Sequence, residues 1–467
     1  MATTRAEDRS VEARSATLTR ELGVTDLALT QILFVVGLPW VGVAAKLGPS
    51  HVVFWLFAIV LFYLPSAVVV TYLNTLMPLE GGLYQWAKLG FNDLMGFLVA
   101  WNLWLFAILN TSESGLQLTQ YLAYIVPSAA WLLNSALFVA LVNALIVGAL
   151  VAITVRGLGV GKWVHKAGGA LILLTFAALL LLPWLNLAHG TLPAFHPLAT
   201  AAPAVTVFSL NILGKMGFGA LGGFEYVAIH AGECRNPVRS IARSVVVAAP
   251  IIAVMFILGT SSVIALVPFD QIDLIAPIPQ VLSAGLRPFG GAGLVAPIAI
   301  VVLACVRMAQ ASVTFAGNTR LPMVAGWDGV LPAWFTRLDP RHRTPVNSIV
   351  FVGAATFVLA CAGLVGVGKQ EAFQLLWNAS AIFYALTYLV MFAIPIVGLR
   401  GRADRPPLWL RAAALSGFLM TALYVTLSIL PIVPVESRVV FAAKICGLIV
   451  ATNAVAIAIF RRGRSSR

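Results

Sequence analysis

Long apolar runs separated by short polar breaks recur along nearly the whole chain. A helix needs about 20 mostly apolar residues to cross the hydrocarbon core of a bilayer. Runs of that length predict spans at 26–47, 51–77, 93–117, 132–155, 164–186, 204–231, 240–267, 291–318, 346–367, 371–397, 406–431 and 438–460. No soluble domain fits between them. The pattern therefore predicts an all-α polytopic membrane protein with twelve transmembrane helices.

Two of the twelve spans contain clusters of residues that interrupt helices. The first span carries VVGLPWVG, and the sixth carries GKMGFGALGGFE, residues 214–225. Glycine and proline cost about 1 and about 3 kcal/mol relative to alanine in a helix interior, so we expect both helices to break at these points. A break at membrane depth must be buried in protein or line a wet cavity, because lipid cannot pair its N–H and C=O groups.

The positions of the two interrupted spans predict a repeated architecture. Span one opens a first set of five helices and span six a second set, as in transporters built from inverted repeats. We expect a transport core at 26–397, with five-plus-five inverted repeats at about 26–186 and 204–397. Two extra C-terminal helices follow at 406–460, and 1–25 and 461–467 are expected to be cytoplasmic tails.

Composition and charge agree with a membrane protein. Of the 467 residues, 60% are hydrophobic and 10% are charged, which does not describe a soluble surface. The net charge of +13 would by itself suggest a nucleic-acid partner. However, 23 of the 30 lysine and arginine residues fall on one side of the membrane when both termini are placed inside. The positive-inside rule thus predicts two cytoplasmic termini and explains the charge without nucleic acid.

The glycine cluster contains GFGALG, a literal match to the dinucleotide fingerprint G-x-G-x-x-G. That fingerprint requires a preceding strand and a βαβ unit, whereas here VTVFSLNIL precedes it within one membrane-length run. We therefore expect no nucleotide cofactor. Gly219 and Gly223 also form a G-x-x-x-G, so close helix packing remains an alternative role. The four cysteines have no spacing typical of a disulfide framework, and no metal site is expected.

The two breaks are the expected binding site for a small solute. A half-helix that ends in the membrane leaves carbonyls with partial negative charge, and the next half-helix begins with free N–H groups. Adjacent breaks therefore offer groups for both a carboxylate and an ammonium. The candidate substrate-binding residues are Gly37, Leu38, Pro39, Trp40, Val41, Gly42, Asn110, Glu113, Phe218, Gly219, Ala220, Leu221, Gly222, Gly223 and Phe224. For the aromatic residues among them, core packing is the open alternative to contact with an amine.

Four ionisable residues lie inside predicted spans, where each costs about 2.5–3.5 kcal/mol on insertion scales. Glu113, Lys215, Glu225 and Arg307 are therefore candidates for recognising solute charge or for coupling transport to an ion. Mutual neutralisation, Glu113 with Lys215 or with Arg307, is the alternative. These four residues do not choose between a cationic and a zwitterionic solute. Weaker polar candidates are Thr175 in span five and Gln310, Ser312 and Thr314 in span eight.

Three stretches in the expected order resemble the amino acid–polyamine–organocation permeases. They are PLEGGLYQWAKLGF after span two, GGFEYVAIHAGECRNPVRSIARS at span six, and NTRLPMVAGWDGVLPAWFTRLDPRHRTPVNS after span eight. The resemblance implies twelve helices, an inverted repeat, and proton-coupled uptake or exchange of amino acids or polyamines, with solute contacts at the two breaks. GLPW in span one departs from the G-S-G-I-F of many amino-acid members. It is closer to the G-G-P-F of the branch that contains plant-type polyamine and cation transporters.

The sequence thus predicts a secondary active transporter rather than an enzyme. We expect it to move an amino acid or related amine by alternating access, coupled to protons or sodium or to exchange, in a bacterial inner membrane or a plasma membrane. One alternative is a polyamine or cationic-amine transporter of the same fold. Another, from a different class, is a solute-sensing membrane receptor that does not transport. The sequence does not specify the oligomeric state.

Overall fold

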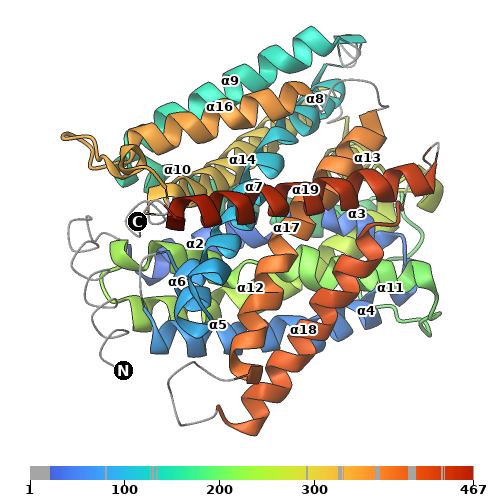
Figure 1. Cartoon of the computed structure of the whole chain (residues 1–467). Coiled ribbons are helices and arrows are strands. Elements are labelled where there is room, and N and C mark those ends of the chain that lie inside the picture. Colours follow the sequence, from blue (N-terminus) through green and yellow to red (C-terminus); the bar gives the residue numbers. More distant parts are fainter. Residues whose placement is uncertain are drawn as a thin grey trace.

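The structure, a computed structural model, describes residues 22–78, 81–126, 128, 131–132, 135–290, 293–323, 329, 331–362, 369–397, 406–432, 435 and 437–465. Helices make up the regular structure of this described part of the chain (Figure 1). Ten of them are long and apolar enough to cross a membrane, and two shorter apolar helices add to these. Each of the twelve expected spans overlaps one of these segments, which confirms an all-α polytopic membrane protein. Most of the expected tail 1–25 lies outside the described residues.

The first half of the chain contains one split helix followed by longer ones. The first expected span is divided into α2 (Val24–Val35) and α3 (Trp40–Ala45). The second contains a π-helical turn, Ile59–Tyr63, between α4 (His51–Ala58) and α5 (Leu64–Leu76). The remaining helices of this half are α6 (Leu83–Gly90), α7 (Asp93–Ser112), α8 (Ser114–Ile125), α9 (Ala136–Val155) and α10 (Leu158–Ala188).

The second half begins with the other interrupted span. There α11 (Val207–Gly214) continues into a π-helical segment, Lys215–Ala220, and a 3-10 helix, Phe224–Glu233. The helices that follow are α12 (Pro237–Leu266), α13 (Pro277–Leu286), α14 (Val295–Thr319), α16 (Val346–Ala362), α17 (Lys369–Val397), α18 (Leu408–Ser428) and α19 (Arg438–Ser465). Both expected interruptions are thus present in the structure. The inverted relation between the two halves stays a prediction.

Local sequence explains where several of these helices begin. The Asn92 side chain accepts a hydrogen bond from the Met95 N–H at the start of α7 (3.0 Å), and Asn236 does the same for Arg239 at the start of α12 (3.2 Å). Pro237 occupies the first position of α12, where its missing N–H removes no helical hydrogen bond. Asparagine caps of this kind pair N–H groups that the first helical turn leaves free.

The interrupted helices lie inside the bundle. Helix α2 packs against α10, α12 and α14, and α3 packs against the π-helical segment Lys215–Ala220. Helix α17 packs extensively against α7 and α18. Outer helices instead expose large apolar side chains; Leu137, Leu141 and Leu145 form one exposed stripe along α9. The irregular backbone is therefore surrounded by protein, and apolar side chains face the position of the lipid.

One end of the bundle joins several segments that are distant in sequence. The Leu22 N–H donates to the Glu233 carbonyl, and the Arg235 N–H donates to the Leu22 carbonyl (both 3.1 Å). Arg320, directly after α14, forms a buried ion pair with the Glu233 carboxylate. The start of α2, the end of span six and the end of α14 therefore meet at this end.

Both ends of the described chain lie at this end of the bundle. Phe460, near the end of α19, packs against Phe97 near the start of α7 (ring centroids 5.7 Å apart). Helix α6 leads into α7, and the segment before α6 contacts the end of span six. There the Gly81 N–H donates to the Ile229 carbonyl (3.2 Å). The start of α2 and the end of α19 are thus on the same side (Figure 1). That this side is cytoplasmic stays a prediction from the charge pattern.

Candidate functional site

The break in the first span is held by a side chain from α14. Helix α2 ends at Val35 and α3 begins at Trp40. The Gln310 side-chain amide donates to the Leu33 carbonyl (3.0 Å) and to the Val36 carbonyl (2.8 Å). The Gly37 N–H donates to the Val35 carbonyl (2.8 Å). The sequence predicts carbonyls that are free for an ammonium group, and the structure instead gives three of them partners within the protein.

The break in the sixth span lies at Gly222 and Gly223. Gly223 has a φ of +137°, a conformation that residues with a Cβ rarely adopt. Its N–H donates to the Tyr388 hydroxyl on α17 (2.6 Å), and the Gly222 N–H donates to the Phe218 carbonyl (3.0 Å). The glycine cluster therefore does interrupt the helix. A side chain from another span again pairs a main-chain group that the break releases.

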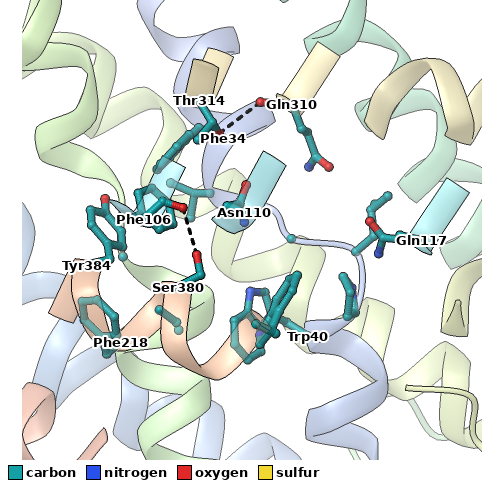
Figure 2. Close-up of a pocket in the computed structure, with 18 of the residues that line it drawn as sticks. Phe34, Trp40, Phe106, Asn110, Gln117, Phe218, Gln310, Thr314, Ser380 and Tyr384 are labelled. Atoms are coloured by element: carbon teal, nitrogen blue, oxygen red, sulfur yellow. Dashed lines mark hydrogen bonds between the residues drawn. The ribbon is translucent and has the colours of Figure 1, made fainter. Parts of the chain in front are cut away.

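A cavity of about 80 Å³ lies between the two breaks (Figure 2). A buried water needs roughly 10–15 Å³ of such space, so the cavity has room for about five to eight water-sized groups, which suits a small solute. Residues from α2, α3, α7, α8, span six, α14 and α17 line it. They are Phe34, Val35, Gly37, Leu38, Pro39, Trp40, Phe106, Asn110, Gln117, Phe218, Gly219, Gly222, Arg307, Gln310, Thr314, Trp377, Ser380, Ala381 and Tyr384.

The structure brings many, but not all, of the candidate residues to this cavity. Gly37, Leu38, Pro39, Trp40, Asn110, Phe218, Gly219, Gly222 and Arg307 line it. The other candidates at the breaks are buried beside it; Phe224, for example, stacks on Tyr63 (4.7 Å between centroids), and a Cβ on Gly42 would lie 2.8 Å from the Pro277 ring. These neighbours are Val41, Gly42, Ala220, Leu221, Gly223 and Phe224.

Arg307 and Glu113 form a buried ion pair at the edge of the cavity. The Arg307 Nη2 lies 2.6 Å from the Glu113 Oε1, and the two side chains are 6% and 0% exposed. Arg307 Nε donates to the Gln117 side-chain oxygen, and Nη2 also contacts the Asn110 carbonyl (3.3 Å). Of the two pairings left open by the sequence, the structure thus contains Glu113 with Arg307. Arg307 lines the cavity, and Glu113 lies behind it.

Three of the other coupling candidates lie away from the cavity lining. Lys215 is buried and donates from Nζ to the Asn378 side-chain oxygen (3.1 Å), with its Nζ 5.6 Å from the centre of the Tyr424 ring. The Thr175 hydroxyl donates to the Leu171 carbonyl of its own helix (2.8 Å). The Ser312 hydroxyl lies 3.4 Å from the Nε2 of His165 and lines a separate cavity of about 30 Å³. None of these contacts reaches the space between the breaks.

Glu225 is connected to the cavity through α17. Its carboxylate accepts hydrogen bonds from the hydroxyls of both Tyr384 and Tyr388. Tyr384 lines the cavity, and Tyr388 also accepts the N–H of Gly223. A continuous chain of hydrogen bonds therefore joins the break in span six, the buried carboxylate and the solute cavity.

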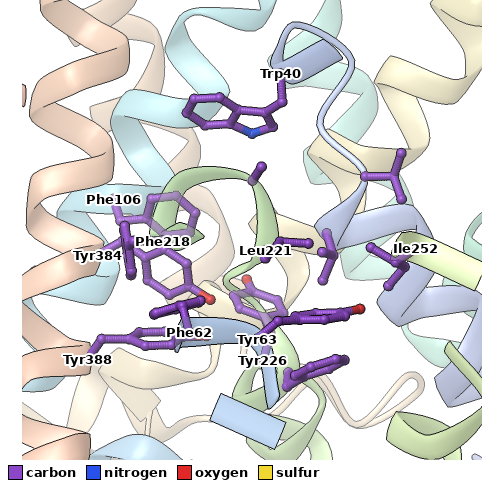
Figure 3. Packing of buried hydrophobic residues seen from close by; sticks show 14 of the residues in the cluster. Trp40, Phe62, Tyr63, Phe106, Phe218, Leu221, Tyr226, Ile252, Tyr384 and Tyr388 are labelled. Carbon is purple, nitrogen blue, oxygen red and sulfur yellow. The ribbon is translucent and has the colours of Figure 1, made fainter. Parts of the chain in front are cut away.

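Aromatic pairs surround the cavity at successive levels. Trp40 meets Trp377 edge to face (5.1 Å), Phe106 stacks on Tyr384 (4.3 Å), and Phe34 stacks on Tyr226 (4.0 Å). Figure 3 places Trp40 and Tyr226 at opposite ends of this cluster, with Phe106, Phe218 and Tyr384 between them. Trp40, Trp377, Phe106, Tyr384 and Phe34 among these rings also line the cavity.

Sequence reasoning missed the contribution of α17 and some of the aromatic lining. Trp377, Ser380 and Tyr384 line the cavity from a span whose apolar run looked ordinary. With Tyr388 they recur every three or four residues, which places them on one helical face. Side chains with hydroxyl or ring N–H groups that recur on one face of an apolar span are the sequence signal that predicts such lining residues. The other missed lining residues are Phe34, Val35, Phe106, Gln117 and Ala381.

Replacing Gln310 with leucine is expected to destabilise the protein. The change leaves the carbonyls of Leu33 and Val36 without their amide donor inside the membrane, at a cost of roughly 1–3 kcal/mol in total. We expect a lower melting temperature for purified Gln310→Leu in detergent. Thr314→Val is the matched control, because the Thr314 hydroxyl bonds only to the Gln310 carbonyl of its own helix (3.2 Å) among the described contacts. Equal melting temperatures for the two variants would contradict the capping role of Gln310.

Comparisons with known proteins agree with this architecture. Residues 22–451 match the model of the amino acid permease family. The chain is 24% identical over 394 residues to an uncharacterised transporter of Legionella pneumophila, covering 82% of each protein. It is 22% identical over 395 residues to a methylthioribose transporter of Bacillus subtilis, covering 79% of this chain and 82% of that protein.

A further relative is a probable agmatine/putrescine antiporter of Lactococcus lactis. It is 22% identical over 357 residues, covering 74% of this chain and 73% of that protein. The family and the names of these relatives indicate a multi-pass membrane transporter rather than an enzyme, and they confirm the resemblance to amino acid–polyamine–organocation permeases. With the match extending over nearly the whole chain, this protein belongs to the amino acid permease family.

Proposed function

We propose that this protein is a secondary active transporter that binds a small amino acid or related amine in the cavity between the two helix breaks. The observation that carries the proposal is the cavity itself. It lies inside the bundle, between irregular backbone segments of spans one and six, and combines a guanidinium, side-chain amides and aromatic faces. Sites at the junction of discontinuous helices are typical of transporters built from inverted repeats.

Transport would proceed by alternating access of this cavity to the two sides of the membrane. The proposed moving unit contains the two interrupted spans, at 26–47 and 204–231, which would move relative to the other helices of the repeats at about 26–186 and 204–397. Trp40 with Trp377 would cover the cavity on one side, and Phe34 with Tyr226 would cover it on the other. Both termini would face the cytoplasm of a bacterial cell or the cytoplasmic side of a plasma membrane, as the charge pattern predicts.

Coupling to protons is the version of this proposal that the buried groups support best. Glu225 has its carboxyl group inside the bundle. This group accepts a hydrogen bond from the Tyr384 hydroxyl, and Tyr384 lines the cavity. A proton on this carboxyl would change the hydrogen bonding of both tyrosines and, through Tyr388, of the break at Gly223. A transport measurement that shows coupling to sodium, or exchange of two solutes, would contradict proton coupling.

Uptake by purified protein in liposomes tests the proposal. We expect radiolabelled solute to accumulate when an inward proton gradient is imposed, and the accumulation to collapse when a protonophore is added. The panel includes neutral and cationic amino acids, putrescine and agmatine, each with and without sodium. Binding of a solute without uptake or counterflow would contradict the proposal and favour a receptor.

A further inference from the structure

We propose that Arg307 binds the carboxylate of the transported solute, so that the site prefers amino acids over the amines that lack this group. The inference rests on the proposed function, because it assigns the chemical class of solute to the same cavity. It also assigns a role to a charged residue of α14. The sequence alone left both the solute charge and the role of Arg307 open.

The guanidinium has one nitrogen available to a ligand. Its Nε donates to Gln117, and its Nη2 contacts Glu113 and the Asn110 carbonyl. Among the described residues, Nη1 has no hydrogen-bond partner, while Arg307 lines the cavity. Arginine recognises carboxylates through such directed N–H groups, and hydrogen bonds between charged groups are about twice as strong as neutral ones.

The contacts of Arg307 also fix its position before a solute arrives. Three protein groups, from α7, α8 and the residue between them, hold two of its nitrogens, and the side chain is 6% exposed. A guanidinium held in this way loses little further conformational freedom when it binds a ligand. Glu113 lies 2.6 Å from Arg307 and gives the buried guanidinium an ion-pair partner within the protein. The ion pair therefore holds the Arg307 guanidinium in place as a hydrogen-bond donor, with the Glu113 carboxylate as its partner.

The main-chain donors at the two breaks are largely used within the protein. The N–H groups of Gly37, Gly222 and Gly223 donate to Val35, Phe218 and Tyr388. Pro39, in the middle of the first break, has no N–H to offer. A carboxylate that enters the cavity therefore finds fewer free main-chain donors than two broken helices would ordinarily provide, and Arg307 is the charged donor in the lining.

The lining is poorly suited to a solute with several positive charges. The described residues that line the cavity include the Arg307 guanidinium and no carboxylate. A diamine would lose the hydration of two charges without a matching anion, which is costly in a buried site. A single ammonium fits better, because the faces of Trp40, Phe106 and Tyr384 and the side-chain amide of Asn110 border the same space.

Matched solute pairs that differ only in the carboxylate test this inference. Ornithine and putrescine form one pair, and leucine and 3-methylbutylamine form another. Competition against a labelled transported solute in proteoliposomes gives the preference within each pair. We expect wild-type protein to prefer the amino acid by about tenfold or more, as one charge-assisted hydrogen bond implies.

Two variants connect that preference to Arg307. Arg307→Gln alone would leave Glu113 buried and uncompensated, so the test uses Arg307→Gln combined with Glu113→Gln, which removes both charges together. We expect the preference within each pair to fall to about one. Arg307→Lys retains a positive charge for Glu113 but lacks the planar fork, and we expect an intermediate preference. Lys215→Gln removes another buried cation, and the preference ratio should stay at the wild-type value.

The outcomes separate this inference from the proposed function. Preference for putrescine or 3-methylbutylamine by wild-type protein would overturn the inference and leave the transporter assignment standing. So would a double variant that is folded, transports and keeps the wild-type preference. Failure of wild-type protein to transport any amino acid or amine of the panel would instead overturn the proposed function, and the inference with it.

Discussion

Replacing Gly223 with alanine is expected to abolish transport and to destabilise the protein. Gly223 has a φ of +137°, and a Cβ at this position would lie 2.7 Å from the Phe34 ring and 2.8 Å from the Val35 side chain. Backbone strain and overpacking together cost roughly 2–6 kcal/mol. Relief of the strain would rotate the Gly223 N–H away from Tyr388 and displace Phe34 from the cavity wall.

Melting temperature and uptake of the purified Gly223→Ala variant measure this effect. Gly148→Ala is the matched control, because Gly148 lies in the middle of α9 and a Cβ there would have no neighbour within 4 Å. Alanine in a helix interior is favoured by about 0.5–1 kcal/mol, so the control should be as stable as wild type or slightly more stable. Wild-type stability and uptake for Gly223→Ala would show that the break does not require glycine.

Replacing Glu225 with glutamine is expected to reduce proton-driven uptake by about tenfold or more while the protein remains folded. The glutamine amide is close in size to the carboxyl but cannot release a proton, and it offers one oxygen where the carboxylate offers two acceptors to Tyr384 and Tyr388. Its N–H groups would also compete with Gly223 for the Tyr388 oxygen. The loss corresponds to at least about 1.4 kcal/mol in the rate-limiting step.

The comparison of uptake with counterflow separates coupling from binding. A variant impaired only in proton coupling should lose uptake driven by a proton gradient and retain solute exchange. Glu371→Gln is the control, since Glu371 lies at the start of α17, 3.8 Å from Lys444 at its closest, outside the cavity lining. Wild-type uptake by Glu225→Gln would remove Glu225 from the mechanism.

The two interruptions were predictable because their cause is local. Glycine and proline disfavour helix wherever they cluster, and VVGLPWVG and GKMGFGALGGFE differ in this respect from the surrounding apolar runs. Spans were predictable for the same reason, since length and hydropathy are properties of a single segment. The structure accordingly places α2, α3 and the divided sixth helix close to the expected ranges.

The partners of the interruptions were not predictable, because they come from helices that are distant in sequence. Gln310 lies 277 and 274 positions from the carbonyls that it caps, and Tyr388 lies 165 positions from Gly223. Whether a half-helix end is free for a solute or paired by a side chain depends on the packing of α14 and α17. The pairing of Arg307 with Glu113, rather than Lys215 with Glu113, was decided by the same packing.

The contacts at the start of α2 have a mechanical consequence for the proposed transport cycle. Two main-chain hydrogen bonds tie Leu22 to the segment that ends span six, and the ion pair between Glu233 and Arg320 anchors that segment to α14. If α2 moves during transport, either the end of span six moves with it, or both hydrogen bonds of Leu22 break at a site where Leu22 and Glu233 are buried. We therefore expect the two interrupted helices to move together at this end of the bundle, because moving them apart would break both hydrogen bonds of Leu22.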